Sequence, residues 1–334
     1  MKKNYRFFAT ICFALMVFTL SAVKKTTKNK STSIISLENA NSQLSIDLQG
    51  GAIVDFHLKA VEINPFAWKV TTAQMPENNK CGAVFQGHFL CTGRWGAPAE
   101  GEIKAGVPHN GQASRDTWKV LKSTKSSLTM QIKAPLDGVI ITRNIELLPN
   151  QANFKVTESF QNYTSVGRLF NVVQHATIGT PFLSEDCIVE SNAREGFLQT
   201  YAYPNPHKSA YSWPMVKSAI GNDSIDLRRA YTPESYVSTH IFADSIGWIS
   251  INNPAYGLTL KYSWKTAEYP WVNVWQQRVD GKLWAKGLEF GTTGIGRSYQ
   301  ELLAHDTRFY GRNSYFFLDA GEKISKSYDC ILQR

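Results

Sequence analysis

Residues 170–183 read FNVVQHATIGTPFL, an apolar run that contains one imidazole, His175, and is broken by a glycine and a proline. Upstream, residues 154–160 alternate between apolar and polar side chains as a strand does, and Asn162 begins a turn-like segment. His175 is therefore predicted to lie on the next strand of a sheet. Most such histidines are core residues bonded to a backbone carbonyl, but an imidazole can also give or take a proton near neutral pH. The context in the rest of the chain decides between these two interpretations.

The chain begins with the features of a secretory signal peptide. Lys2, Lys3 and Arg6 precede the apolar residues 7–20, and two small residues end the segment at position 22. The apolar run is shorter than the ~20 residues of a membrane-spanning helix. Residues 1–22 are therefore predicted to be cleaved, residues 23–33 to form a polar leader, and the mature protein to be periplasmic or secreted without contacting a membrane.

The charge of the chain is concentrated in this first segment. Residues 1–33 hold seven Lys or Arg and no acidic residue, so the formal charge of +9 falls to +2 for residues 34–334. A nearly neutral domain gives no electrostatic reason to expect a nucleic-acid partner.

Residues 34–334 are expected to form a single all-β domain, because no linker, charge block or repeat divides them. Short alternating segments recur, and a hairpin-like Gly50-Gly51 joins two of them. Residues 298–304 are the only segment expected to be helical. Many short strands predict a large antiparallel β-supersandwich. The cysteines at 81, 91, 187 and 330 match no zinc spacing, and a Cys81–Cys91 bridge or unpaired buried thiols are both compatible with export.

Two loops carry polar groups that suit a binding site. His109 lies in the rigid turn VPHNG, residues 107–111, and Arg94 lies beside Trp95 in the glycine-rich residues 87–96. An arginine next to an aromatic ring is suited to hydroxyls or carboxylates. Both residues are equally compatible with ordinary surface loops.

Tryptophans are concentrated in one segment of the C-terminal third of the domain. Four tryptophans lie within residues 264–284, among them Trp271 and Trp275. Flat aromatic surfaces pack on the C–H faces of sugar rings, and indole N–H groups bind hydroxyls. Most of these tryptophans are expected to be core residues, and at least one of Trp271 and Trp275 is predicted to line a sugar cleft.

Glu289 is the strongest candidate for a catalytic carboxylate. It stands between Leu and Phe in residues 287–296, GLEFGTTGIG. A glutamate in an apolar frame is either a functional base or paired with a cation. The glycine-rich segment lacks the ending of a phosphate loop and opens no nucleotide-binding unit.

Together these features resemble the galactose mutarotase (aldose 1-epimerase) superfamily over most of residues 34–330. The order of the motifs carries the resemblance: a first hairpin at residues 37–53, His109-Asn110-Gly111 before Trp118, Asn162 before His175, and the C-terminal Glu289. The sequence has Ala176-Thr177-Ile178-Gly179 where typical members have Tyr or Phe followed by Asn and Leu.

The resemblance implies a β-supersandwich with a sugar cleft across one sheet, and mutarotation without a cofactor or a metal. His175 would be the acid and Glu289 the base, on opposite sides of the sugar. His109 and Arg94 would hold ring hydroxyls, and His240 would be a further binding residue. The partner would be a small sugar or an oligosaccharide.

Two other functions are compatible with the sequence. The first is a non-catalytic carbohydrate-binding protein on the same fold, because a fold does not fix a function. The second is a polysaccharide lyase or hydrolase, which is less favoured because hydrolysis requires two carboxylates across a cleft and only Glu289 is a clear candidate.

The signal peptide generates the first prediction. The mature protein is expected to begin near Val23, because the small residues that end the apolar run are the cleavage signal. Mass spectrometry of the periplasmic or secreted fraction measures this. Recovery only in the cytoplasm, with residues 1–22 intact, would contradict it.

Overall fold

The computed structural model describes residues 33–199, 203, 205, 211–217 and 224–334. Ser33–Arg334 forms one compact unit by its contacts. The expected signal peptide and all of the leader except Ser33 lie outside the described residues. None of the helices in the described part of the chain has the length and apolar character that a membrane crossing requires.

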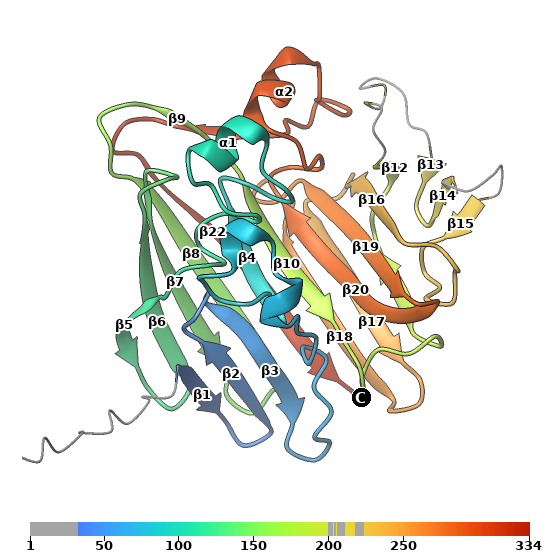
Figure 1. Cartoon of the computed structure of the whole chain (residues 1–334). Helices are drawn as coiled ribbons and strands as arrows, with labels where there is room; N and C mark the ends of the chain where they lie inside the picture. Colours follow the sequence, from blue (N-terminus) through green and yellow to red (C-terminus); the bar gives the residue numbers. More distant parts are fainter. Residues whose placement is uncertain (1–32, 200–202, 204, 206–210, 218–223) are drawn as a thin grey trace, which may run out of the picture. The chain divides into compact units, whose positions relative to one another are not determined.

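Two large antiparallel sheets make up most of the fold (Figure 1). In spatial order the ten-stranded sheet consists of β1 (Ile34–Glu38), β2 (Ser42–Asp47), β3 (Ala52–Leu58), β4 (His88–Thr92), β10 (Val172–Ile178), β20 (Lys282–Gly291), β19 (Trp271–Val279), β16 (Tyr236–Ile241), β12 (Glu195–Leu198) and β13 (Tyr211–Ser212). The eight-stranded sheet consists of β11 (Ile188–Ser191), β17 (Ile246–Asn253), β18 (Leu258–Lys265), β22 (Lys323–Gln333), β8 (Asn153–Asn162), β7 (Val139–Leu147), β6 (Ser127–Ala134) and β5 (Lys119–Ser123).

Smaller elements lie between the strands of these sheets along the chain. Two short strand pairs are β14 (Met215–Lys217) with β15 (Ser224–Asp226) and β9 (Arg168–Phe170) with β21 (Phe316–Leu318). The helices are η1 (Thr72–Gln74), η2 (Glu77–Asn79), α1 (Glu100–Lys104) and α2 (Tyr299–Ala304). The prediction of an all-β antiparallel sandwich is confirmed.

The alternation of side chains explains how the sheets pack. In β7 every second residue is buried, and β8 follows the same pattern. Their inward side chains join those of the ten-stranded sheet in one hydrophobic core. All seven residues of β10 are buried, because this strand has one face on the core and the other beneath loops.

The two α-helices lie at the same end of the sheets (Figure 1). α2 was expected, and it begins where Ser298 Oγ accepts a hydrogen bond from the Glu301 backbone N–H. α1 was not expected. It has only five residues, includes Gly101, and has no apolar periodicity, so its sequence carries no helical signal.

A charged pair is buried between the sheets. Arg143 of β7 and Glu158 of β8 are fully buried, and Arg143 Nε donates to Glu158 Oε1 at 2.7 Å. Arg143 Nη1 also donates to the Gly51 carbonyl at 2.7 Å, and its guanidinium lies over the Trp118 ring. The other carboxylate oxygen of Glu158 accepts from Gln174 Nε2 of β10 at 2.6 Å, so the pair links the two sheets.

The second prediction concerns this pair. Arg143→Met should reduce the free energy of unfolding by about 3–5 kcal/mol, because it leaves the Glu158 carboxylate buried without a counter-charge. Chemical denaturation measures the change. Arg143→Met combined with Glu158→Leu should cost less than the sum of the two single changes.

The exposed pair of Lys104 with Glu100 on α1 supplies the control. Lys104→Met should leave the denaturation midpoint unchanged, because solvent screens this pair. If the losses in the free energy of unfolding caused by Arg143→Met and Glu158→Leu simply add in the double variant, then the two side chains do not compensate each other's buried charge.

Candidate functional site

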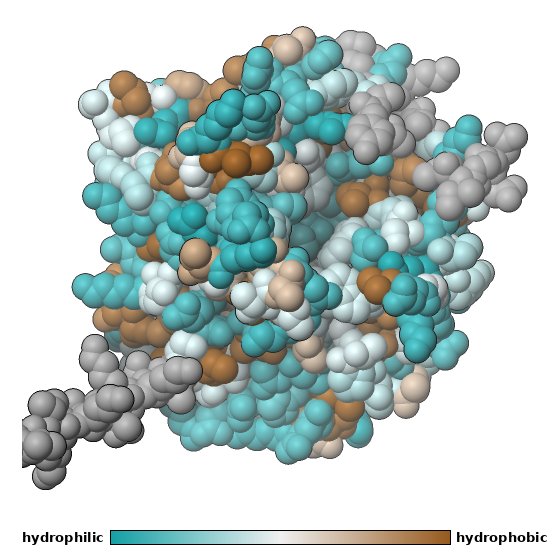
Figure 2. Space-filling model, viewed as in Figure 1, coloured by the Kyte–Doolittle hydropathy of each residue, from teal (hydrophilic) through white to brown (hydrophobic). Residues whose placement is uncertain are grey.

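A cleft of about 420 Å³ opens on the face of the ten-stranded sheet that points away from the eight-stranded sheet. Figure 2 shows this face hollowed near its middle. The assignment of the face follows from strand alternation, because Gln174 points into the core and its neighbour His175 points the other way. The cleft is lined by Trp68, Val70, Gln74, Pro76, Phe85, Phe89, Trp95, Gly96, His109, Asn110, His175, Gln199, Val237, Trp275, Trp284, Glu289 and Gly296.

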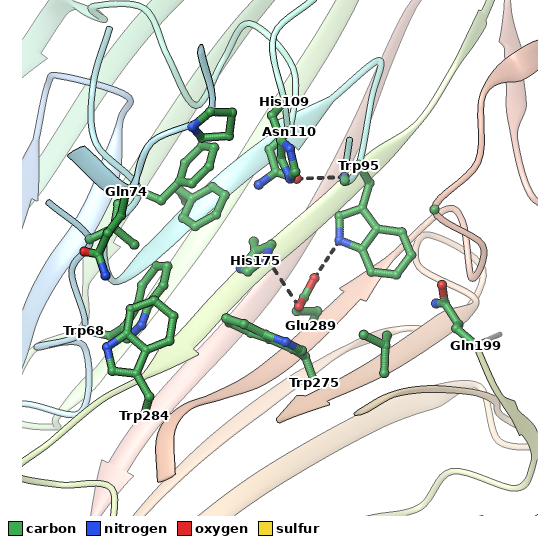
Figure 3. Close-up of a pocket in the computed structure, with 17 residues that line it drawn as sticks. Trp68, Gln74, Trp95, His109, Asn110, His175, Gln199, Trp275, Trp284 and Glu289 are labelled. Carbon is green, nitrogen blue, oxygen red and sulfur yellow. Dashed lines mark hydrogen bonds and ion pairs between the residues drawn. The ribbon is translucent and has the colours of Figure 1, made fainter. Parts of the chain in front are cut away.

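His175 and Glu289 are in contact at the centre of the cleft (Figure 3). They lie on the neighbouring strands β10 and β20, and the pairs Val173–Gly291 and Thr177–Gly287 bracket them in the register. His175 Nε2 lies 3.4 Å from Glu289 Oε1. The two side chains therefore lie side by side on one sheet and face the same cleft.

Neighbouring groups hold the imidazole of His175 in place. Its Nδ1 lies 2.9 Å from Thr177 Oγ1, and its ring stacks on Phe89 with 4.3 Å between centroids. Trp275 approaches the same ring edge-on, with 5.7 Å between centroids. These contacts fix the ring plane, so that Nε2 faces Glu289.

The loop after β4 holds the carboxyl group of Glu289. Trp95 Nε1 donates to Glu289 Oε2 at 2.8 Å, which leaves Oε1 toward His175. The Gly96 N–H donates to Asn110 Oδ1 at 2.7 Å and so ties this loop to the turn that carries His109. The turn itself depends on Gly111, whose φ is +80° and whose missing Cβ would collide with the Thr92 carbonyl.

Burial changes the acid–base behaviour of the site. Apolar surroundings disfavour charge, so they raise the pKa of Glu289 and lower the pKa of His175. The Trp95 N–H opposes the first shift because it stabilises the carboxylate. Both shifts favour the uncharged forms, so burial favours a carboxylic acid beside a neutral imidazole over an ion pair at the 3.4 Å contact.

His109 is also uncharged at neutral pH. Burial and the nearby positive charge of Arg94 lower its pKa to about 4. Its ring packs against Phe85 with 5.8 Å between centroids. Of the residues proposed from the sequence, the structure thus brings His109, His175, Trp275 and Glu289 together in one cleft.

Arg94, His240 and Trp271 do not line this cleft, contrary to the roles expected for them. Gly93 has a φ of +67° and turns the chain, so the Arg94 guanidinium lies in the loop, donates to the Ala97 carbonyl, and faces Glu102 at 3.4 Å. Its neighbour Trp95 takes the place in the cleft.

His240 and Trp271 are enclosed by other parts of the chain. His240 is fully buried on β16, where its Nδ1 donates to the Arg194 carbonyl at 3.1 Å and its ring packs edge-on against Trp213. Trp271 shares a strand face with Trp275 but lies about 13 Å away along β19. There its Nε1 donates to the Asn313 carbonyl at 2.8 Å, within a separate hydrophobic cluster.

Several lining residues had no individual assignment from sequence. Trp95 and Trp284 belong to the segments that were singled out, whereas Trp68 lies in a stretch without any motif. No three His, Cys, Asp or Glu side chains of the described residues group in a way that suits a metal ion. The four cysteines that the structure describes are free, so Cys81 and Cys91 form no bridge; Cys81 is exposed and the others are buried.

Comparisons with known proteins identify the fold. No family model matches the sequence. No curated protein matches it either. Solved structures do match: a galactose mutarotase related enzyme from Lactobacillus acidophilus is 13% identical with a TM-score of 0.61, over 90% of this chain and 97% of that one.

Two further structures agree with this match. A galactose mutarotase-like protein from Clostridium acetobutylicum is 13% identical with a TM-score of 0.61, over 90% of this chain and 95% of that one. A candidate aldose 1-epimerase from Escherichia coli K12 is 14% identical with a TM-score of 0.58, over 90% and 98%. The chain therefore has the galactose mutarotase-like fold, as the order of its sequence motifs predicted.

Proposed function

We propose that this chain is an exported enzyme of the aldose 1-epimerase type, which interconverts the anomers of a sugar. The observation that carries the proposal is the contact of His175 with Glu289 in an open aromatic cleft. Such a cleft offers apolar surface to the faces of a sugar ring and proton-transfer groups to its oxygens. Export rests on residues 1–22 alone.

The position of the pair fits the chemistry of mutarotation. The ring oxygen and the anomeric hydroxyl are both bonded to C1, so two side chains in contact with each other can reach both oxygens. Ring opening adds a proton to the ring oxygen and removes one from the anomeric hydroxyl. Ring closure on the other face reverses both transfers, so the reaction consumes no proton overall.

A pair that holds one proton can carry out this cycle without an external acid or base. Burial favours the protonated form of Glu289 and disfavours that of His175, so in this proposal the carboxylic acid is the first donor and the His175 imidazole the first acceptor. This order reverses the roles that the family resemblance implies. Whichever residue donates first, one full cycle of ring opening and closure returns His175 and Glu289 to their starting protonation states.

A carbohydrate-binding protein without catalysis is the second candidate. The observation that favours it is the position of Arg94 and His240, two expected hydroxyl-binding residues, outside the cleft. Binding of sugar without any acceleration of mutarotation would select this candidate.

The third prediction tests the pair. Glu289→Gln should keep sugar binding and lower turnover by ~10²–10⁴-fold. The amide can hydrogen-bond a sugar hydroxyl, but it cannot act as a general acid or base at neutral pH. His175→Asn should have a similar effect, and the double variant should lose no more than either alone, since the two groups act as a unit. Polarimetry of a freshly dissolved α-sugar measures turnover above the spontaneous rate.

Glu146→Gln is the matched control, because Glu146 is exposed on β7 of the other sheet. It should retain the turnover of the unaltered protein. If Glu289→Gln also retains it, the assignment of the proton-transfer pair is wrong.

The fourth prediction concerns pH. Burial raises the pKa of Glu289 to about 8, so the catalysed rate should fall as pH rises through this value and the pair loses its proton. Trp95→Phe removes the N–H that stabilises the carboxylate, so this variant should move the alkaline limb to higher pH. Polarimetry across pH, corrected for the base-catalysed background, measures both profiles. An alkaline limb at the same pH in Trp95→Phe would contradict the role of the Trp95 hydrogen bond.

A further inference from the structure

The cleft extends well beyond the His175–Glu289 pair. Glu289 and Trp284 both line it from β20 although an odd spacing of five positions separates them, because the register of β20 against β19 shifts next to Trp284. Five steps of extended chain correspond to at most roughly 16 Å. This length exceeds that of one six-membered sugar ring. A monosaccharide with C1 at the pair would leave the Trp284 end of the cleft empty.

A glycine keeps the floor open between these two positions. A Cβ at Gly287 would approach Glu289 Oε1 at 2.9 Å and Trp275 Cβ at 3.1 Å. Trp275 of β19 is paired with Gly287 of β20. The missing Cβ of Gly287 leaves room for the Trp275 side chain next to the carboxyl group of Glu289. The floor thus continues from the pair to the tryptophans without a bulky side chain in between.

Three indole rings form a corner at the far end, which we call the tryptophan corner: Trp68, Trp275 and Trp284. The Trp68 ring is 5.2 Å from that of Trp284 and 6.0 Å from that of Trp275, and both contacts are edge-on. Figure 3 shows Trp275 beside the pair, Trp68 and Trp284 farther away, and Gln74 next to them. The buried Trp68 Nε1 has no hydrogen-bond partner among the described residues, so this corner holds an unsatisfied donor.

The charge of the cleft limits the ligand to neutral molecules. Within the described part of the chain, no Lys, Arg or Asp lines it, and Glu289 is its only acidic residue. Arg94 is turned into its own loop. A phosphate or carboxylate on the sugar would therefore lose its hydration without gaining a cationic partner.

We propose that the tryptophan corner binds the second ring of a neutral reducing disaccharide or longer oligosaccharide, whose reducing-end ring lies at His175 and Glu289. The inference rests on the proposed function, since it places C1 of the reducing end at the pair. The remainder of a glycan is attached through another carbon of that ring, so it extends away from the pair and along the floor. The indole faces then pack on the C–H face of the second ring.

Titration calorimetry tests the inference with glucose, galactose, maltose, cellobiose, lactose and glucose 6-phosphate. At least one disaccharide should bind about five- to tenfold more tightly than its reducing-end monosaccharide, as expected for packing one ring on aromatic side chains. Trp284→Ala should reduce the ratio of disaccharide to monosaccharide affinity to about one. Glucose 6-phosphate should bind more weakly than glucose.

Trp248→Ala is the matched control, because Trp248 lies on β17 of the other sheet under Lys261. It should preserve the preference for the disaccharide. Equal affinities for monosaccharides and disaccharides, a preference that survives Trp284→Ala, or tighter binding of glucose 6-phosphate would overturn the inference. Mutarotation of monosaccharides without any disaccharide preference would leave the proposed function standing, whereas failure of every sugar to bind would remove both.

Discussion

The hydrogen bond from Gln174 to Glu158 joins the two sheets directly beneath the cleft. Arg143 compensates the charge of the buried Glu158. The second carboxylate oxygen of Glu158 can therefore accept the hydrogen bond from Gln174 of β10. Side chains alternate along a strand, so this inward contact of Gln174 directs His175 outward. A slip of one residue would bury His175 in the core and place Gln174 in the cleft. The position of the His175–Glu289 pair thus depends on a polar contact on the opposite face of β10.

The sequence predicted the architecture because half-buried strands leave a period of two in the side chains. β7 and β8 show this pattern, whereas nothing in it indicates that Arg143 pairs with Glu158 in the interior. β10 has no such alternation because both of its faces are covered, and it was predicted as a strand from the alternating residues 154–160 and the turn that precede it and from the breaking residues after it. α1 is too short to leave any periodic signal.

The candidate site was predictable where a residue lies on a regular strand and less so in loops. His175 and Glu289 reach the cleft through strand geometry. Arg94 and Trp95 are adjacent in a loop, and the turn at Gly93 decides which of them enters the cleft. Trp271 shares a strand face with Trp275, but the segment near Asn313 covers Trp271. The sequence around Trp271 cannot predict a contact with a segment so far along the chain.

The number of carboxylates in the cleft bears on the class of reaction. Glycoside hydrolysis uses two carboxyl groups placed across the scissile bond. Among the described lining residues only Glu289 has a carboxyl group, and its partner is an imidazole in contact with it. Two groups so close together do not flank a bond or leave room for an attacking water between them. They suit the movement of protons between two oxygens on one carbon. The geometry of the pair, rather than the fold that carries it, therefore favours an isomerisation over a bond cleavage.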